Sequence, residues 1–160
     1  MAIVSAAAGT RALGVDLGER RIGLALSDPT RTVASPHVVL RRAATHDADH
    51  RAIVGEARAN DVTTIVVGLP LSLSGARGPA ARATDREIEE LRRAAAPGIE
   101  VVAHDERLTT ITAERSLDEA GLRRGDRTAV VDKVAAAVML QSWLESPAAR
   151  AAAPGTTATR

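Results

Sequence analysis

The chain has 160 residues, which is enough for one domain with a substantial apolar core, and it contains no cysteine. A disulfide framework and a thiolate metal site are therefore excluded. No apolar run is long enough to span a membrane and no secretory leader is recognisable, so we expect a cytoplasmic protein without a membrane partner. The formal net charge is +1, and Trp143 is the only aromatic side chain, which disfavours recognition of single strands by base stacking.

The N-terminal part of the chain predicts a β-hairpin. Two short apolar runs, Ala12–Val15 and Ile22–Leu26, flank a polar turn at residues 18–21. Period-two alternation places Asp16 on the same face as Gly14, opposite the apolar side chains of that strand. A carboxylate in a buried strand is costly unless it is paired or binds a cation. The alternative is that Asp16 only caps the corner of the turn.

The rest of the chain alternates between strand-like and helix-like patterns. A third strand is expected at Val33–Leu40, where Pro36 favours the edge of a sheet. Further strands are expected at Thr63–Gly68 and Ile99–Ala103, helices at about Asp47–Ala59 (capped by Asp47), Ala80–Ala95, Thr110–Ala120 and Ala129–Ser146, and a polar loop at Arg123–Arg127.

This order of elements predicts an α/β fold. We expect a mixed five-stranded sheet, with three antiparallel strands followed by two parallel ones, flanked by helices. Residues 1–10 are expected to be a loose leader, 11–146 the folded domain, and 147–160 a disordered tail with little to bury.

Acidic residues are expected to meet at one edge of this sheet. Asp16 follows the first strand, and Asp105 and Glu106 follow the fifth. Adjacent residues of a strand point to opposite faces, so only one of Asp105 and Glu106 can meet Asp16, and the sequence leaves both open. Asp132 lies at the end of an apolar helical stripe that must pack on the sheet. Each acid near a helix start has an alternative role, which is to complement the helix dipole.

Three converging carboxylates repel one another unless cations neutralise them. Oxygen ligands without histidine or cysteine suit Mg²⁺ or Mn²⁺, and His104 is expected to be a half-exposed strand end rather than a ligand. Two such ions, roughly 4 Å apart, would activate water and stabilise the leaving oxygen of a phosphodiester.

Four stretches, in order along the chain, resemble the YqgF (RuvX) family. They are Asp-Leu-Gly-Glu-Arg-Arg-Ile-Gly-Leu-Ala-Leu-Ser-Asp (16–28), Val-Gly-Leu-Pro-Leu-Ser-Leu-Ser-Gly (67–75), Asp-Glu-Arg-Leu-Thr-Thr (105–110) and Val-Asp-Lys-Val-Ala-Ala (131–136). Members of this family are described as pre-16S ribosomal RNA nucleases or Holliday junction resolvases of the RNase H-like superfamily. The resemblance covers about Arg11 to Leu144. It implies an RNase H-like nuclease domain with Asp16, Glu106 and Asp132 as the catalytic acids and metal ligands.

Other residues near these acids are candidates for substrate binding. Arginine side chains there can clamp phosphates, although structural partners of the acids would look the same. The segment from Gly68 to Gly75 can form a rim for a sugar-phosphate strand, or it is a loop stiffened by proline. The candidates are Gly18, Arg20, Arg21, Gly68, Leu69, Pro70, Gly75 and Arg107.

These observations favour a metal-dependent endonuclease that acts on structured RNA as a monomer or weak homodimer. The resemblance implies that this RNA is the 5′ end of precursor 16S ribosomal RNA. One alternative is a resolvase of branched DNA, and another is a non-catalytic nucleic-acid-binding assembly factor. The Asp-x-Gly hairpin also opens the fold of sugar kinases and actin-like ATPases. At 160 residues the chain is too short for the second lobe that those proteins need.

Overall fold

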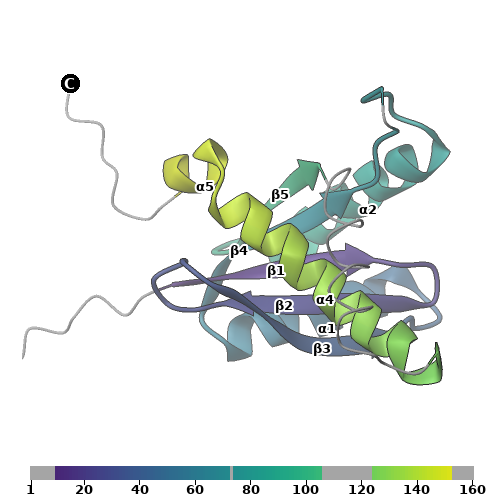
Figure 1. The fold of residues 1–160 in the computed structure, drawn as a ribbon, viewed down its shortest axis with the longest axis horizontal. Helices are drawn as coiled ribbons and strands as arrows, with labels where there is room; N and C mark the ends of the chain where they lie inside the picture. Colours follow the sequence, from purple (N-terminus) through teal and green to yellow (C-terminus); the bar gives the residue numbers. More distant parts are fainter. Residues whose placement is uncertain (1–9, 73, 106–123, 153–160) are drawn as a thin grey trace, which may run out of the picture.

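The computed structural model describes residues 10–72, 74–105 and 124–152, and within 124–130 the backbone alone. Its centre is a five-stranded sheet in the order β3-β2-β1-β4-β5 (Figure 1). The strands are β1 (Arg11–Leu17), β2 (Arg21–Ser27), β3 (Ala34–Arg41), β4 (Val62–Leu69) and β5 (Glu100–Asp105). β1, β2 and β3 pair antiparallel, whereas β4 lies parallel to both β1 and β5. The predicted mixed sheet is confirmed.

Helices cover both faces of the sheet (Figure 1). One face packs against α1 (His46–Ala59) and α2 (Pro79–Ala95), and the other is crossed by α4 (Arg124–Leu144), which is followed by the short α5 (Pro147–Ala151). No helix in the described ranges is both long and apolar enough to cross a bilayer. The predicted helix at 110–120 lies outside the described residues.

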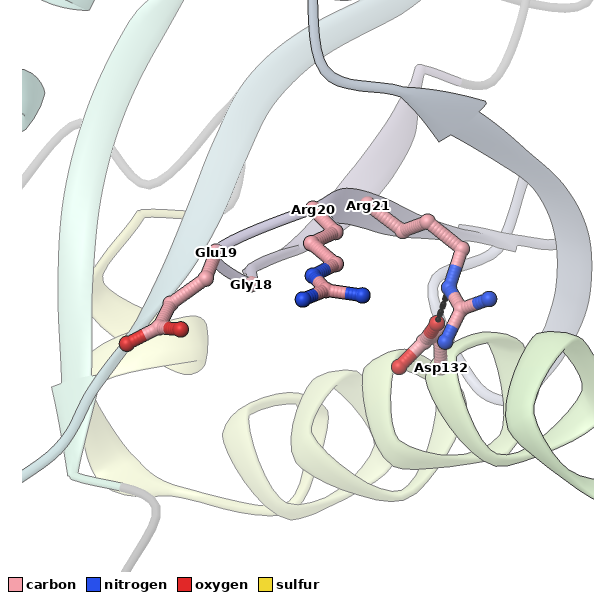
Figure 2. Close-up of a pocket in the computed structure, with 5 residues that line it drawn as sticks. All are labelled: Gly18, Glu19, Arg20, Arg21 and Asp132. Carbon is pink, nitrogen blue, oxygen red and sulfur yellow. Dashed lines mark hydrogen bonds and ion pairs between the residues drawn. The ribbon is translucent and has the colours of Figure 1, made fainter.

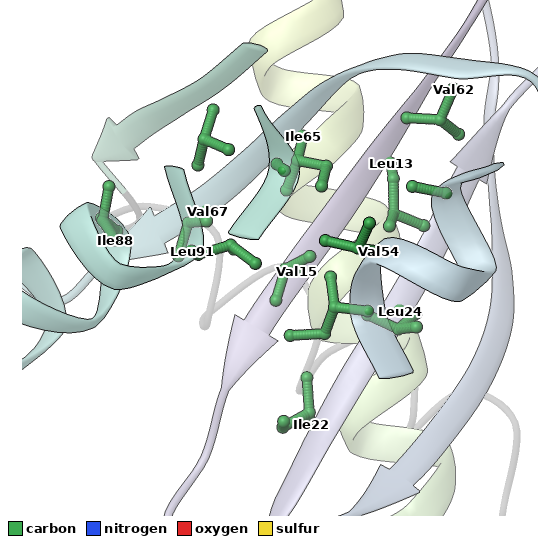
Figure 3. Close-up of a cluster of buried hydrophobic side chains, with 14 residues drawn as sticks. Leu13, Val15, Ile22, Leu24, Val54, Val62, Ile65, Val67, Ile88 and Leu91 are labelled. Carbon is green, nitrogen blue, oxygen red and sulfur yellow. The ribbon is translucent and has the colours of Figure 1, made fainter. Parts of the chain in front are cut away.

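The core is divided by the sheet into two clusters of different composition. The aliphatic cluster, between the sheet and the α1–α2 layer, contains Leu13, Val15, Ile22, Leu24, Ile53, Val54, Ala57, Val62, Ile65, Val67, Ile88, Leu91, Ala95 and Val101 (Figure 3). The α4 cluster, on the other face, contains Ala12, Ala25, Val66, Ala136, Ala137, Met139, Leu140 and Trp143. The stripe predicted on the last helix is therefore confirmed as the face that packs on the sheet.

Strand β3 is an edge strand, as Pro36 predicted. Its register with β2 shifts between Leu24 and Ala25, and Pro36 lies opposite Ala25 at this irregularity. A central strand needs N–H donors toward both of its neighbours, and proline has no N–H to donate. Proline is therefore tolerated in an edge strand or at a bulge.

The helix boundaries correct two expectations. Helix α1 is capped by Thr45, whose hydroxyl accepts a hydrogen bond from the N–H of Ala48 at 3.2 Å, and not by Asp47. Helix α4 begins at Arg124, so the expected polar loop at 123–127 is helical from Arg124 onward. Apolar periodicity identifies only the part of a helix that packs against the core. It therefore does not predict a polar first turn.

The segment after Ser146 is ordered at its start, against the expected disorder. Ser146 caps α5 by accepting from the N–H of Ala149, and Pro147 occupies the first turn, where its missing N–H costs nothing. Ala149 and Ala152 pack against the α4 cluster. Alanine contributes too little apolar signal to be recognised as a docking face. Residues 153–160, like residues 1–9, lie outside the described part.

Candidate active site

Strand β1 presents Asp16 on the face of the sheet that α4 covers. Val15 lies in the aliphatic cluster, whereas Ala12 lies in the α4 cluster, so the side chains alternate as predicted. Asp16 therefore shares the α4 face with Gly14, and it lies opposite Gly23 of β2 in the register.

Two glycines allow the backbone of α4 to lie directly on this face. A Cβ atom added to Gly23 would stand 2.1 Å from the carbonyl oxygen of Asp132, which is far inside van der Waals contact. A Cβ atom added to Gly14 would stand 2.8 Å from Cβ of Leu140 and 3.0 Å from the carbonyl oxygen of Ala136. The space beside these two glycines is thus filled by α4, and this close approach carries Asp132 to the site.

Asp16 and Asp132 form an acidic pair. Burial, and then the negative charge of Asp132, raise the pKa of Asp16 from 3.8 to about 6. Both causes disfavour the ionised carboxylate of Asp16, and no ion pair to Asp16 occurs among the described residues. Two hard oxygen donors with this repulsion fit a divalent cation of the Mg²⁺ type.

The described residues do not complete a metal site by themselves. No group of three or more histidine, cysteine, aspartate or glutamate side chains that could hold an ion occurs in the ranges 10–72, 74–105 and 124–152. The third predicted acid, Glu106, lies outside these ranges, and so does Arg107.

The β1–β2 turn forms the solvent side of the site. A shallow pocket is lined by Gly18, Glu19, Arg20, Arg21 and Asp132. Nε of Arg21 donates to Oδ2 of Asp132 at 2.8 Å, and the two side chains are 37% and 23% exposed, so the ion pair is accessible to solvent. Figure 2 shows the guanidinium groups of Arg20 and Arg21 extending toward α4, with Glu19 directed away from Asp132.

The end of β5 places Asp105 on the wrong face for this site. Nε2 of His104 lies 3.0 Å from Oγ of Ser142 on α4, so His104 is on the α4 face. Val101 belongs to the aliphatic cluster on the other face of the sheet. Because side chains alternate along a strand, Asp105 shares that face with Val101. His104 is half-buried, as predicted, and burial lowers its pKa, against the opposing charge of Asp105.

The predicted rim after β4 is only partly accessible. Val67 lies beside Val15 in the parallel register, so the end of β4 is level with Asp16. Gly68 and Leu69 are buried within the protein, however, whereas Pro70 and Gly75 are half-buried in the following loop. Gly75 has a φ of 82° and donates its N–H to the carbonyl of Ser72 at 2.8 Å. The loop is therefore a closed turn in which glycine is the residue that the backbone favours.

Two residues at the site were not singled out from the sequence. Glu19 lines the pocket, and Arg42 donates from Nε to the carbonyl oxygen of Gly18 at 2.9 Å. Glu19 was detectable, because it belongs to the turn that carries Arg20 and Arg21. Arg42 had no local signal, since it follows β3 and contacts a turn 24 residues away.

Comparison with known proteins assigns the chain to a family. The family model described as "RuvX: Holliday junction resolvase" matches residues 10–146. A protein of Mycobacterium sp. (strain KMS) named "Putative pre-16S rRNA nuclease" is 42% identical over 145 residues, which are 91% of this chain and 85% of that protein. A protein of the same name from Kineococcus radiotolerans is 47% identical over 135 residues, or 84% of this chain and 71% of that protein. The structure of T. thermophilus RuvC in complex with a Holliday junction substrate overlaps 85% of this chain and 96% of that chain, with a TM-score of 0.49 and 14% identity. The family model and the two relatives show that this chain belongs to the RuvX family.

Proposed function

We propose that this protein is a metal-dependent endonuclease that hydrolyses phosphodiester bonds in precursor 16S ribosomal RNA. The names of its relatives point to that substrate. The observation that carries the proposal is the acidic pair of Asp16 and Asp132 beside solvent-accessible arginines of the β1–β2 turn. Acids that can hold cations, next to guanidinium groups that can bind phosphate, are suited to this reaction.

Asp16 and Asp132 would hold Mg²⁺ or Mn²⁺, two ions in the complete site. The chemistry supplied by the bound ions is a more acidic water and neutralisation of charge on the phosphate. Burial and Asp132 disfavour the ionised form of Asp16 in the metal-free site, and a bound cation would favour it. Arg21 keeps Asp132 oriented through the Nε–Oδ2 contact.

The arginines of the turn would bind the sugar-phosphate backbone. Nε of Arg21 is engaged with Asp132, while Arg20 is exposed and has no ion pair among the described residues. Planar guanidinium groups bind phosphate oxygens bidentately and read no base sequence. Binding should therefore weaken steeply with salt and discriminate little between sequences.

Glu106 remains our proposed third acid. The alternation along β5 supports Glu106 over Asp105, because His104 lies on the α4 face and Asp105 shares the opposite face with Val101. Arg107 is likewise retained as a proposed phosphate ligand. Activity should survive Asp105→Asn and be lost in Glu106→Gln, and the reverse result would show that the assignment is wrong.

The proposed activity is tested by a cleavage assay with two substrates. A labelled precursor 16S RNA fragment with its 5′ extension and a synthetic four-way DNA junction are incubated separately with wild-type protein, Asp16→Asn and Asp61→Asn. Asp61 is a matched control, because it is exposed in the turn before β4, at the opposite end of the parallel strands. We expect RNA cleavage that requires Mg²⁺ or Mn²⁺ and falls at least about a hundredfold in Asp16→Asn only. Undiminished cleavage in excess chelator would contradict the metal mechanism.

Holliday junction resolution is the second candidate function, because the matching family model carries that description. Symmetric cutting of a junction needs two active sites in a stable dimer. Among the described residues, Val33 is the one large apolar side chain that is strongly exposed. An extensive apolar interface therefore has little support, and we propose a monomer or weak homodimer acting in the cytoplasm. A tight dimer in light scattering that nicks the junction symmetrically and ignores the RNA would favour the resolvase. Binding of RNA without any cleavage would instead favour a non-catalytic assembly factor.

A further inference from the structure

A buried ionic network lies behind the β1–β2 turn, on the face of the sheet away from α4. Arg42 is at its centre. The side-chain Nε of Arg42 donates to the carbonyl oxygen of Gly18 at 2.9 Å, and its backbone N–H donates to the carbonyl oxygen of Arg20 at 2.9 Å. One residue therefore holds two carbonyls of the turn that lines the candidate site.

The guanidinium of Arg42 is itself held by two helices. Its Nη1 and Nη2 atoms contact Oε1 and Oε2 of Glu87 from α2 at 2.5 and 3.1 Å, which is a bidentate pair. Nη1 also contacts Oδ2 of Asp49 from α1 at 3.0 Å. The two acids are 6% and 3% exposed, so both depend on this partner for compensation of their charge.

Further contacts fix the acids in place. Oδ1 of Asp49 accepts from the backbone N–H of Ala43 at 2.7 Å, and Nε2 of His50 lies 3.3 Å from Oε1 of Glu87. Burial alone would raise the pKa of Glu87, but the hydrogen bond and charge of Arg42 lower it, so the carboxylate stays ionised. The guanidinium group of Arg42 is planar and donates to a backbone carbonyl and to two buried acids. It therefore has little freedom to rotate.

We propose that Arg42 is a positioning residue for nucleic-acid binding, which sets the turn so that Arg20 faces the phosphate backbone beside Asp132. This proposal rests on the proposed function, because it assigns phosphate binding to that turn. Glu87 of α2 and Asp49 of α1 hold Arg42 in place. The α1–α2 layer is thereby connected, through Arg42, to the turn that lines the candidate site on the opposite face of the sheet. Arg42 contacts neither substrate nor metal in this scheme and acts only through the turn.

The test is a double-mutant cycle on binding and cleavage. Arg42→Lys retains the charge but cannot contact Gly18, Asp49 and Glu87 together. Arg92→Lys is the matched control, because Arg92 also clamps a backbone carbonyl, that of Val101 at 3.0 Å, and an acid, Glu89, far from the turn. The four proteins of the cycle are wild type, Arg42→Lys, Arg20→Ala and the double variant.

We expect Arg42→Lys to weaken binding of the RNA about tenfold, measured by fluorescence anisotropy in Ca²⁺, to raise KM by a similar factor, and to change kcat by less than about threefold. Arg42→Lys and Arg20→Ala should each also reduce the salt dependence of binding. The double variant should bind no more than about twofold more weakly than Arg20→Ala, because both changes act through the same turn. Arg92→Lys should lower Tm without changing affinity.

Several outcomes would overturn the proposal. If Arg42→Lys lowers Tm and leaves affinity and KM unchanged, the network is only structural. If the effects of Arg20→Ala and Arg42→Lys multiply, Arg42 does not act through the turn. Should Arg42→Lys fail to fold, Glu87→Gln serves in its place, since it preserves the size of the side chain and one contact to Arg42. If wild-type protein binds the RNA but does not cleave it, the proposed nuclease function fails and the role of Arg42 in binding can still be tested. If wild-type protein does not bind the RNA, both the proposed function and the role of Arg42 are overturned.

Discussion

The two faces of the sheet are packed on different principles. On the α1–α2 face, large branched side chains such as Leu24 and Ile65 fill the space between the layers (Figure 3). On the α4 face, glycine and alanine let a helix backbone lie directly on the strands. The first face contributes most of the burial of apolar surface. On the α4 face, Gly14 and Gly23 have no side chain, so α4 lies close to the strands and brings Asp132 to Asp16. The candidate site therefore lies on the face where two glycines admit the backbone of α4, because this close approach brings Asp132 to Asp16.

The largest expected effect on stability lies on the aliphatic face. Leu24 is fully buried there, and Leu24→Ala should lower the free energy of unfolding by about 2–5 kcal/mol through lost burial and a residual cavity. Cleavage per folded molecule should remain near that of wild type well below Tm, since the α4 face is intact. Chemical denaturation and an assay at low temperature measure the two quantities. A hundredfold loss of activity in the folded variant would show that the faces are not separable.

The next largest effect is the pH dependence of the free energy of unfolding of the metal-free protein, which comes from the charge of the acidic pair. Because the pKa of Asp16 is raised to about 6, the folded state binds a proton more tightly than the unfolded state, and stability from this group is lost as pH rises from about 4 through 6. Asp16→Asn should match wild type near pH 4 and be more stable at pH 8, by at most roughly 3 kcal/mol. Urea titrations across this range measure the difference. Added Mg²⁺ at pH 8 should stabilise wild type and not the variant, and equal stabilisation of both would contradict metal binding at Asp16.

Gly23, next to Leu24 in β2, tests the α4 face directly. Gly23→Ala places a Cβ atom against the carbonyl of Asp132, so α4 must shift. We expect a loss of about 1–3 kcal/mol in the free energy of unfolding. Cleavage by the folded variant should fall at least tenfold, because Asp132 moves away from Asp16. The pattern is thus the reverse of Leu24→Ala. Normal cleavage by Gly23→Ala would show that the close approach of α4 does not position the acid.

The smallest effect is expected from removal of the segment after Ser146. Ala149 and Ala152 pack on the α4 cluster, but no residue of α5 is fully buried. Deletion of residues 147–160 should cost less than about 1 kcal/mol, or a few degrees in Tm, with cleavage unchanged. Thermal unfolding followed by circular dichroism is sufficient. A loss of activity would assign a role to this end of the chain that its packing does not indicate.

Local pattern predicted the elements that pack and missed those that do not. Alternation in β1 placed Asp16 correctly on the face of Gly14, and helical spacing identified the buried stripe that ends at Asp132. The polar start of α4 and the alanine-rich α5 were missed, because neither has a strong apolar period. Thr45 rather than Asp47 caps α1, because several polar residues precede that helix and the sequence does not rank them.

The sequence by itself determined which face each residue of β1 occupies and that three antiparallel strands precede two parallel ones, because alternation and element order are recorded along the chain. The family followed from four motifs spread over most of the chain. Only the tertiary structure decided the partners of the charged groups. Arg21 meets Asp132 across 111 residues, and Arg42 meets Glu87 across 45. The physical reason is that periodicity reports whether a position is buried, whereas an ion pair depends on which distant elements the packed sheet and helices bring within about 3 Å.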